Sequence, residues 1–370
     1  MIQKGLSLKV KTIIAICLFV VIFVALVVVV SVNSGALDLA VSDKLVNLGD
    51  TPYTHDAYIT HNVFAFFFEA CGETAIYIFA AISMGILLWY CVKCIKIKPL
   101  NIIMAVVCGI LTVVAFWFYF KTFVGYVLDH IIGFKWDAAD GFYPQITKSD
   151  VLTIKMLEVA AAIICGTGMS FLFKGLKEET LKKLAKWVIC FIIAAAVQTI
   201  LIELIKKPVG RMRYRAMNFF GDYDHNGFTA WYVANGKRYG PDDNWIYSHL
   251  ADTHDMYKSF PSGHTCAAGT TYCLFMLPFA LGVKKKGIKA LCWIAPICYT
   301  GLVAVSRIVA GAHYFSDVLF GGTIAFVCQI VVAEFLLCKG VHVKSLFKKE
   351  EAIVDSEAIA EIPEQDADNM

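Results

Sequence analysis

Long apolar stretches alternate with short polar segments along most of the chain. A helix needs about 20 apolar residues to cross a bilayer, and eight stretches reach that length, at about 12–31, 72–92, 101–120, 152–173, 187–205, 264–282, 288–306 and 313–337. With 58% hydrophobic and 17% charged residues, the chain is far more apolar than a soluble globular domain. The pattern predicts an all-α fold, a polytopic transmembrane helical bundle of about eight spans.

The first apolar stretch has two interpretations. Lys4, Lys9 and Lys11 precede it, which is the arrangement found in a signal peptide. Its uninterrupted length, from Thr12 to Val30, favours a retained helix instead.

Lysine clusters occupy every second polar segment. They precede the first apolar stretch and follow the second, fourth, sixth and eighth. Because basic loops stay in the cytosol, we expect both termini to be cytosolic and the segments 32–71, 121–151, 206–263 and 307–312 to be extracytoplasmic. The sequence contains no Asn-x-Ser/Thr glycosylation site, which favours a bacterial cell membrane over a secretory-pathway membrane.

The polar segments divide the chain into three parts. Residues 1–150 are expected to form N-terminal transmembrane helices with external loops, and residues 151–338 a helical core that carries the long loop 206–263. In the tail 339–370, eight acidic residues and no basic or aromatic ones follow Lys349, so we expect a disordered cytosolic segment. The net charge of +3 gives no support for nucleic-acid binding.

The fifth apolar stretch ends in a cluster of cations. Lys206, Arg211, Arg213 and Arg215 fall together, and Pro208 should end the helix just before its own position, because proline disfavours helix in the preceding residue. Long basic side chains can simply extend to the membrane interface. The positive-inside rule, however, disfavours so many cations on the outer side. Their presence there therefore indicates a function, and a cluster of cations is suited to binding an anion.

The sixth stretch opens with Pro261-Ser262-Gly263-His264. Serine is a favoured N-cap and glycine lets a ligand approach the backbone, so free N–H groups at this helix start could bind an anion beside His264. The alternative interpretation is an ordinary Pro-Ser helix start.

A third cluster precedes the last stretch and contains Arg307, His313 and Asp317. His313 and Asp317 are four residues apart and would share one face of a helix. Asp317 could then accept the imidazole N–H and leave the other ring nitrogen free as a nucleophile or base. Alternatively, the two residues are only polar groups at a helix start.

Successive spans cross in alternate directions, so all three clusters should reach one membrane face. Together they resemble the type 2 phosphatidic acid phosphatase superfamily, integral-membrane relatives of acid phosphatases and vanadium haloperoxidases. The resemblance covers about 200–338. Its three motifs are Lys206 and Arg213 with six residues between them, Pro261-Ser262-Gly263-His264, and Ser306-Arg307 followed after five residues by His313 and after three more by Asp317. Family members usually have proline where this chain has Tyr214.

This resemblance implies a six-helix core, with the two N-terminal spans as additions. It implies a phosphatase for a lipid phosphate or diphosphate in which His313 is the nucleophile and forms a phosphohistidine. Asp317 would orient His313, and His264 would protonate the leaving oxygen and then activate water. No metal or other cofactor is expected, because the phosphoryl oxygens would be held by Lys206, Arg213 and Arg307 with N–H groups near Ser262 and Gly263.

Two other functions use the same residues. A lipid phosphotransferase would pass the phosphoryl group to an alcohol, and a transporter or non-catalytic lipid-phosphate-binding protein would need the cations alone. Phosphatidate, phosphatidylglycerophosphate and undecaprenyl diphosphate are all compatible substrates, and the oligomeric state is open.

The loop 206–263 carries two further patterns. Asp222-x-Asp224-x-Asn226-Gly227 matches the first half of a calcium loop, but Val233 stands where the twelfth-position glutamate is needed, so an Asx-rich turn is the alternative. Many aromatic residues follow one another and would form either a lid over a lipid head group or an interfacial belt. They are Phe219, Phe220, Tyr223, Phe228, Trp231, Tyr232, Tyr239, Trp245 and Tyr247.

Overall fold

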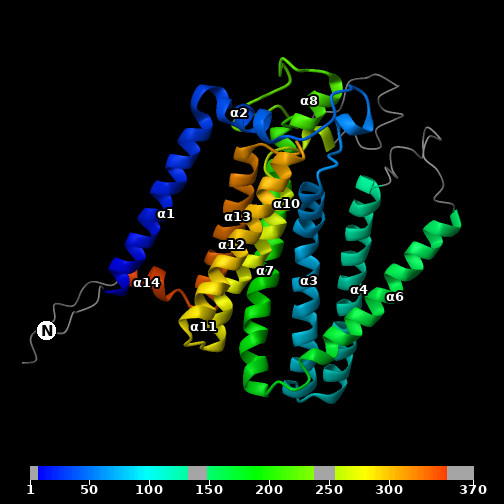
Figure 1. Cartoon of the computed structure of the whole chain (residues 1–370). Helices are drawn as coiled ribbons and strands as arrows, with labels where there is room; N and C mark the ends of the chain where they lie inside the picture. The colour runs from blue at the N-terminus through cyan, green and yellow to red at the C-terminus, as the bar shows by residue number, and fades with distance from the viewer. Residues whose placement is uncertain (1–6, 132–147, 237–254, 348–370) are drawn as a thin grey trace, which may run out of the picture.

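The computed structural model describes residues 7–131, 148–236 and 255–347, and all regular secondary structure in these ranges is helical. Within the described residues, seven helices are long and apolar enough to cross a membrane. They are α1 (Leu8–Ser31), α3 (Val63–Cys94), α4 (Lys98–Ile131), α6 (Lys148–Leu172), α7 (Glu178–Val209), α12 (Lys286–Val309) and α13 (Phe315–Leu336). Their arrangement in Figure 1 confirms the expected all-α polytopic bundle.

The expected sixth span is helical throughout but is not a regular α-helix. Its residues form α10 (Gly263–Ala268), a 3-10 helix η4 (Gly269–Met276) and α11 (Leu277–Leu281), which run in succession through the bundle (Figure 1). Side chains of α7 bind carbonyl groups along this segment. Trp187 Nε1 donates to Cys273 O at 2.8 Å, and Gln198 Nε2 donates to Cys266 O at 3.0 Å. These tertiary bonds hold the segment against α7.

The segment 32–71, expected as an external loop, contains more helix than its sequence indicated. Helix α2 (Ala36–Leu45) follows α1, and a short 3-10 helix η2 (His55–Ala57) follows α2. Helix α3 begins at Val63 rather than near residue 72, because Asn62 caps it: Asn62 Oδ1 accepts the Ala65 N–H at 3.1 Å. As a result, α3 is longer than expected by about two and a half turns, and Ala65, Glu69 and Ala70 of this added part are buried.

The end of α7 also differs from the expectation. The helix continues through Pro208 to Val209 and stops at Gly210, which has the left-handed φ of 53°. Proline is tolerated there because only the last turn is affected. A Cβ on Gly210 would lie 1.9 Å from the Gly236 carbonyl oxygen, so this position requires glycine. The chain then turns, as predicted, and brings Arg211 and Arg213 back over the bundle.

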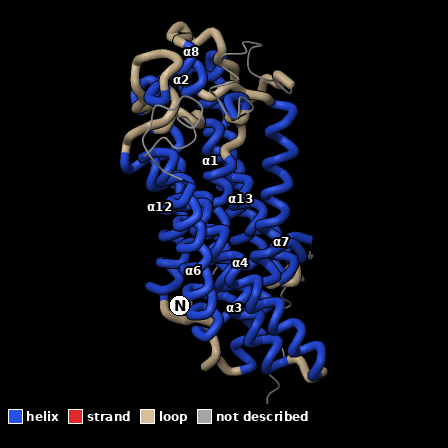
Figure 2. Tube along the Cα trace, turned by 90° about the vertical axis from the view of Figure 1, so that its right-hand side faces the viewer, coloured by secondary structure: helices blue, strands red, loops and turns tan. Residues whose placement is uncertain are grey.

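The two ends of the bundle are different. At one end lie α2, α8 (Tyr214–Phe220) and a group of loops, as Figures 1 and 2 show. The start of α1 and the short helix α14 (Val341–Phe347) lie away from that end. Helix α14 occupies the beginning of the tail that we expected to be disordered, and residues 348–370 lie outside the described residues.

Helix α1 leans away from the other spans in Figure 1 and is exposed along most of its length. It contacts α13 through aromatic pairs, with Phe19 and Phe326 ring centroids 5.6 Å apart and Phe23 and Phe320 centroids 5.8 Å apart. The hydrophobic core lies instead between α7, α3 and η4, where Trp187, Phe191 and Cys273 are buried.

Candidate active site

The three polar clusters meet at the end of the bundle that carries α2 and α8. Ser262 N donates to Asp317 O at 2.9 Å, which joins the second cluster to the third. Arg213 Nη1 donates to Ala312 O at 3.3 Å and joins the first cluster to the third. A Cβ placed on Gly263 would lie 3.0 Å from Lys206 Nζ, which locates that ammonium group beside the start of α10. The geometry thus agrees with the expected convergence on one face.

His313 lies in the turn between α12 and α13 and is 1% exposed. Its Nδ1 is 2.6 Å from the Ser259 carbonyl oxygen, so Nδ1 carries the proton and donates it. Asp317 Oδ2 is 3.8 Å from Nδ1, too far for a hydrogen bond. The expectation that Asp317 accepts this N–H is therefore wrong. Among the described residues, Nε2 of His313 has no hydrogen-bond partner.

The environment of His313 keeps its imidazole neutral. Burial, together with the positive charges of Arg213, Arg307 and Lys206, holds the pKa of His313 well below its usual range. With Nδ1 protonated, the lone pair of the neutral ring is on Nε2. This lone pair lies in the field of three cations, Arg213, Arg307 and Lys206.

Asp317 acts on His313 through Ser259. The fully buried carboxylate accepts the Tyr314 N–H at 2.8 Å and the Ser259 hydroxyl at 2.5 Å, both at Oδ2. The carbonyl oxygen of Ser259 in turn accepts the hydrogen bond from His313 Nδ1. Asp317 thus fixes the residue that orients His313, which is an indirect version of the expected role.

A buried ion network surrounds the other oxygen of Asp317. Arg211 is 0% exposed; its Nη1 lies 2.6 Å from Asp317 Oδ1 and its Nη2 lies 2.8 Å from Asp38 Oδ2. Asp38 of α2 also accepts the Ser316 N–H at 2.8 Å. The Arg211 guanidinium is therefore paired with two carboxylates. It stabilises the start of α13 and is not available to bind an anion.

Arg213 and Arg215 share a single carboxylate. Arg213 Nη2 lies 2.8 Å from Asp255 Oδ1, and Arg215 Nη2 lies 2.7 Å from Asp255 Oδ2. Burial raises the pKa of Asp255, but the two guanidinium groups more than offset this and hold it below its usual range. Two guanidinium groups and one carboxylate leave this cluster with a net positive charge. Arg213 places part of that charge beside Ala312, the residue before His313.

Arg307 is 0% exposed and lies beside Glu69 of α3, with 2.5 Å between Nη1 and Oε2. The contact is a close charge pair without the alignment of a hydrogen bond. Within the described residues, Nε, Nη1 and Nη2 of Arg307 make no hydrogen bond. A buried guanidinium with unsatisfied N–H groups is costly, and an anion with several oxygens would satisfy them.

His264 contacts two residues that sequence reasoning missed. Its Nε2 is 2.7 Å from the Tyr126 hydroxyl of α4 and 3.3 Å from Glu73 Oε2 of α3. The Tyr126 hydroxyl also donates a short hydrogen bond to Glu73. The acid expected from the second motif is thus paired with a carboxylate and a phenol.

The start of α10 is less available to an anion than expected. Ser262 is the N-cap, and its Oγ accepts the Thr265 N–H at 3.3 Å. Because Ser262 N donates to Asp317 O, that N–H cannot also bind a phosphoryl oxygen. Of the two positions expected to supply N–H groups, Ser262 is therefore a structural residue, and only Gly263 remains a candidate.

Comparison with known proteins agrees with this constellation. Residues 186–337 match the model of the PAP2 superfamily. This region of the chain is similar to the PAP2 superfamily. The match contains all three motifs and ends with α13.

Several curated PAP2-type relatives are named as lipid phosphatases. The chain is 28% identical over 138 residues to lipid A 1-phosphatase of Rhizobium etli, which covers 36% of this chain and 45% of that protein. It is 33% identical over 141 residues to probable lipid phosphate phosphatase 4 of Arabidopsis thaliana, covering 36% and 41%. It is 29% identical over 100 residues to phosphatidylglycerophosphatase B of Haemophilus influenzae, covering 27% and 40%. The chain thus spans less than half of each relative's length, and no solved structure matches it.

Residues outside the PAP2 region complete the site. Asp38, Glu69, Glu73 and Tyr126 all precede residue 186, yet each contacts a charged or titratable side chain of the motifs or of Arg211. A sequence signal existed for Glu69 and Glu73, because acidic residues four apart beside an apolar span are costly unless paired. No comparable signal existed for Asp38.

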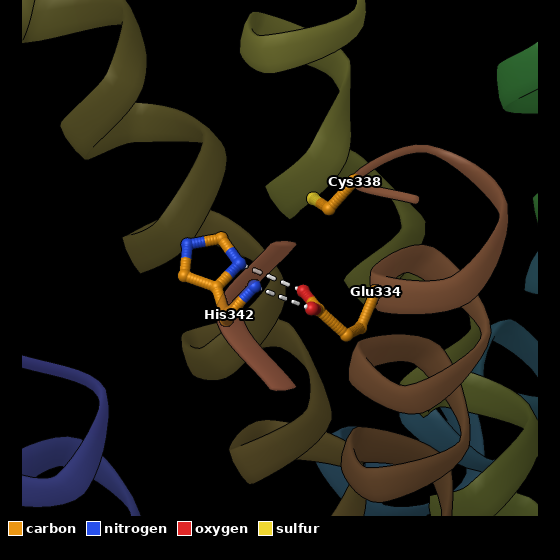
Figure 3. A group of neighbouring side chains, drawn as sticks. All are labelled: Glu334, Cys338 and His342. Carbon is orange, nitrogen blue, oxygen red and sulfur yellow. Dashed lines mark hydrogen bonds and ion pairs between the residues drawn. The ribbon is translucent and has the colours of Figure 1, made fainter. Parts of the chain in front are cut away.

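Two groups resemble metal sites. In the Asx-rich segment, Asp222 Oδ1 accepts the Asn226 N–H at 3.0 Å and Oδ2 accepts the Gly227 N–H at 2.7 Å, as in an Asx turn rather than an open calcium loop. Near the end of α13, Glu334, Cys338 and His342 lie close enough to share an ion (Figure 3). Glu334, however, already binds the N–H and Nδ1 of His342, at 2.8 and 2.7 Å, and so caps α14.

Of the aromatic residues in the long loop, those from Phe219 to Tyr232 are described, and several pack on the site. Trp231 stacks on Phe260 at a centroid distance of 5.7 Å and lies 4.5 Å from Phe320 of α13. Tyr239, Trp245 and Tyr247 lie outside the described residues.

Proposed function

We propose that this protein is a phosphatase of the bacterial cell membrane that hydrolyses a lipid phosphate through a phosphohistidine on His313. The observation that carries the proposal is a pair of buried groups that make no hydrogen bond among the described residues: His313 Nε2 and the Arg307 guanidinium, whose contact with Glu69 is an ion pair alone. A nucleophile needs a free lone pair, and a phosphoryl group needs cationic N–H donors around its oxygens. The names of the PAP2 relatives support the same assignment.

In the first step, Nε2 of His313 attacks phosphorus, the bond from phosphorus to the leaving oxygen breaks, and that oxygen takes a proton from His264. Arg307, Arg213 and Lys206 stabilise the charge on the three remaining oxygens. In the second step, a water molecule gives a proton to His264 and attacks phosphorus. The phosphorus–nitrogen bond breaks, and inorganic phosphate and neutral His313 are released.

The site is proposed to lie on the extracytoplasmic side. The motifs lie at the ends of spans, and the lysine clusters that predict cytosolic loops lie in the alternate connections. A lipid head group in the outer leaflet would therefore reach the site while its chains remain in the bilayer.

The test is phosphate release by purified protein from a panel of lipid phosphates, with His313→Ala as the matched control. We expect release by the natural chain and a loss of at least about a thousandfold in the variant, as for removal of a covalent nucleophile. An alcohol added as acceptor distinguishes transfer from hydrolysis. Near-normal release by His313→Ala would refute the phosphohistidine, and binding without release would point to a non-catalytic role.

A further inference from the structure

Helix α3 presents two carboxylates to the cationic site. Glu69 and Glu73 are four residues apart and therefore lie on one face of the helix. Glu69 Oε2 is 2.5 Å from Arg307 Nη1, and Glu73 Oε2 is 3.3 Å from His264 Nε2. Both residues belong to the part of the chain that precedes the PAP2 match.

Tyr126 joins Glu73 to His264. Its hydroxyl donates to Glu73, because a carboxylate can only accept, and the same oxygen lies 2.7 Å from His264 Nε2. The hydroxyl proton is already used, so the contact to Nε2 requires a proton on that nitrogen. An N–H on Nε2 satisfies this contact in the neutral ring as well as in the imidazolium, and only the imidazolium can act as an acid. Burial and the Arg307 charge disfavour the imidazolium, and the carboxylate of Glu73 opposes them and stabilises it.

Building on the phosphatase function proposed above, we propose that Glu73 makes this site selective for phosphate monoesters of alcohols over diphosphates. An alkoxide is a poor leaving group and needs the proton that Glu73 and Tyr126 hold on His264. The leaving group of a diphosphate is a phosphate, which departs without that proton. The Glu73 carboxylate therefore assists hydrolysis of phosphate monoesters and gives no comparable help to hydrolysis of diphosphates.

The negative charge of Glu73 also favours monoesters over diphosphates by repelling the leaving group of a diphosphate. The leaving atom must come within hydrogen-bond reach of His264 Nε2, hence within roughly 6 Å of the Glu73 carboxylate. A departing phosphate brings negative charge to this position and is repelled by Glu73, whereas a protonated alcohol brings none. For unit charges about 6 Å apart, the penalty is a factor of roughly 3 in water and about 100 at an effective dielectric constant of 20. We therefore expect selectivity of about tenfold from Glu73.

The experiment measures kcat/KM for phosphate release from phosphatidate and from a prenyl diphosphate, both in the same mixed micelles. The natural chain should prefer the monoester. Glu73→Gln keeps the shape and removes the charge, and it should lower the monoester-to-diphosphate ratio by about tenfold. Glu73→Asp keeps the charge and should retain most of the ratio. Glu179→Gln, on the exposed α7 end where Glu179 pairs with Lys183 at 2.7 Å, is the matched control and should leave the ratio unchanged.

A structural role for Glu73 would lower both activities by the same factor, and an unchanged ratio in Glu73→Gln would therefore overturn the proposal. A natural chain that prefers the diphosphate would overturn it as well. If Glu73→Gln does not fold, Tyr126→Phe removes the bridging hydroxyl and should lower the same ratio. Phosphate release from neither substrate would refute the phosphatase function itself, a result distinct from a changed preference.

Discussion

Asp38→Asn removes one negative charge from the centre of the molecule and nearly preserves the side-chain volume. Asp38 is fully buried and accepts three hydrogen bonds: from Ser316 N at 2.8 Å, from Ser316 Oγ at 2.5 Å and from Arg211 Nη2 at 2.8 Å. An asparagine side chain has one acceptor oxygen where the carboxylate has two, so its amide nitrogen must face a donor. The variant therefore loses at least one of these bonds and leaves Arg211 with a single carboxylate partner.

The expected cost follows from this geometry. Removal of one partner from a buried ion pair typically costs about 3–5 kcal/mol. Asp317 still faces Arg211 at 2.6 Å, so we expect the lower end, about 3 kcal/mol. For a chain of 370 residues the midpoint of thermal unfolding should fall by roughly 4 °C. Turnover should fall too, because Asp38 positions Ser316 and thereby the first turn of α13.

Thermal unfolding in detergent micelles measures the effect, and Asp43→Asn is the control. Asp43 lies on the same helix, is exposed, and accepts the Tyr214 hydroxyl at 2.9 Å. Loss of such a surface contact is worth about 1 kcal/mol or less. Equal midpoints for the two variants would refute the reasoning that the Asp38–Arg211 network stabilises the site.

Four further predictions test other parts of the molecule. His264→Ala should slow hydrolysis of alkyl phosphates far more than that of aryl phosphates, whose leaving groups need little protonation; equal losses would contradict its role as an acid. Gly321→Ala should destabilise the protein, since its Cβ would lie 2.4 Å from the Ser262 carbonyl oxygen, whereas the nearest atom to a Cβ on Gly322 is 3.7 Å away and Gly322→Ala should be tolerated. Tyr232→Cys should react with a membrane-impermeant thiol reagent in intact cells, because Tyr232 is exposed at the proposed extracytoplasmic end, and labelling only after the cytosol is opened would refute the orientation. Lipid phosphates in mixed micelles should be hydrolysed in preference to water-soluble phosphate esters, because the site lies at the membrane interface; the reverse preference would refute the lipid assignment.

The membrane architecture could be predicted from the sequence because it depends on local composition. Seven of the eight expected spans correspond to long apolar helices in the described part of the chain. The change of the sixth to a 3-10 helix could not be predicted, because its residues are as apolar as those of a regular span. Its contacts with Trp187 and Gln198 come from another helix, which local composition does not reveal.

The site was predictable to the extent that its chemistry lies in short motifs. Residue spacing identified His264, His313 and Asp317, and the alternation of spans placed them on one face. Partners far away in the sequence were not predictable: Asp38 contacts Ser316 across 278 positions, and Glu73 contacts His264 from another part of the chain. The bond from His313 to Ser259 was missed for a different reason, since helical spacing suggests Asp317 as the partner and gives no information about a backbone carbonyl.

The crossing formed by α10, η4 and α11 has a consequence for how the protein enters the membrane. Backbone carbonyl groups without partners are costly in a lipid interior, and two along this segment are satisfied by Trp187 and Gln198 of α7. Both bonds form only once α7 lies beside the segment, so insertion of the two crossings as neighbours favours its final contacts. Since α10 begins at Gly263, the same contacts hold the helix that carries His264.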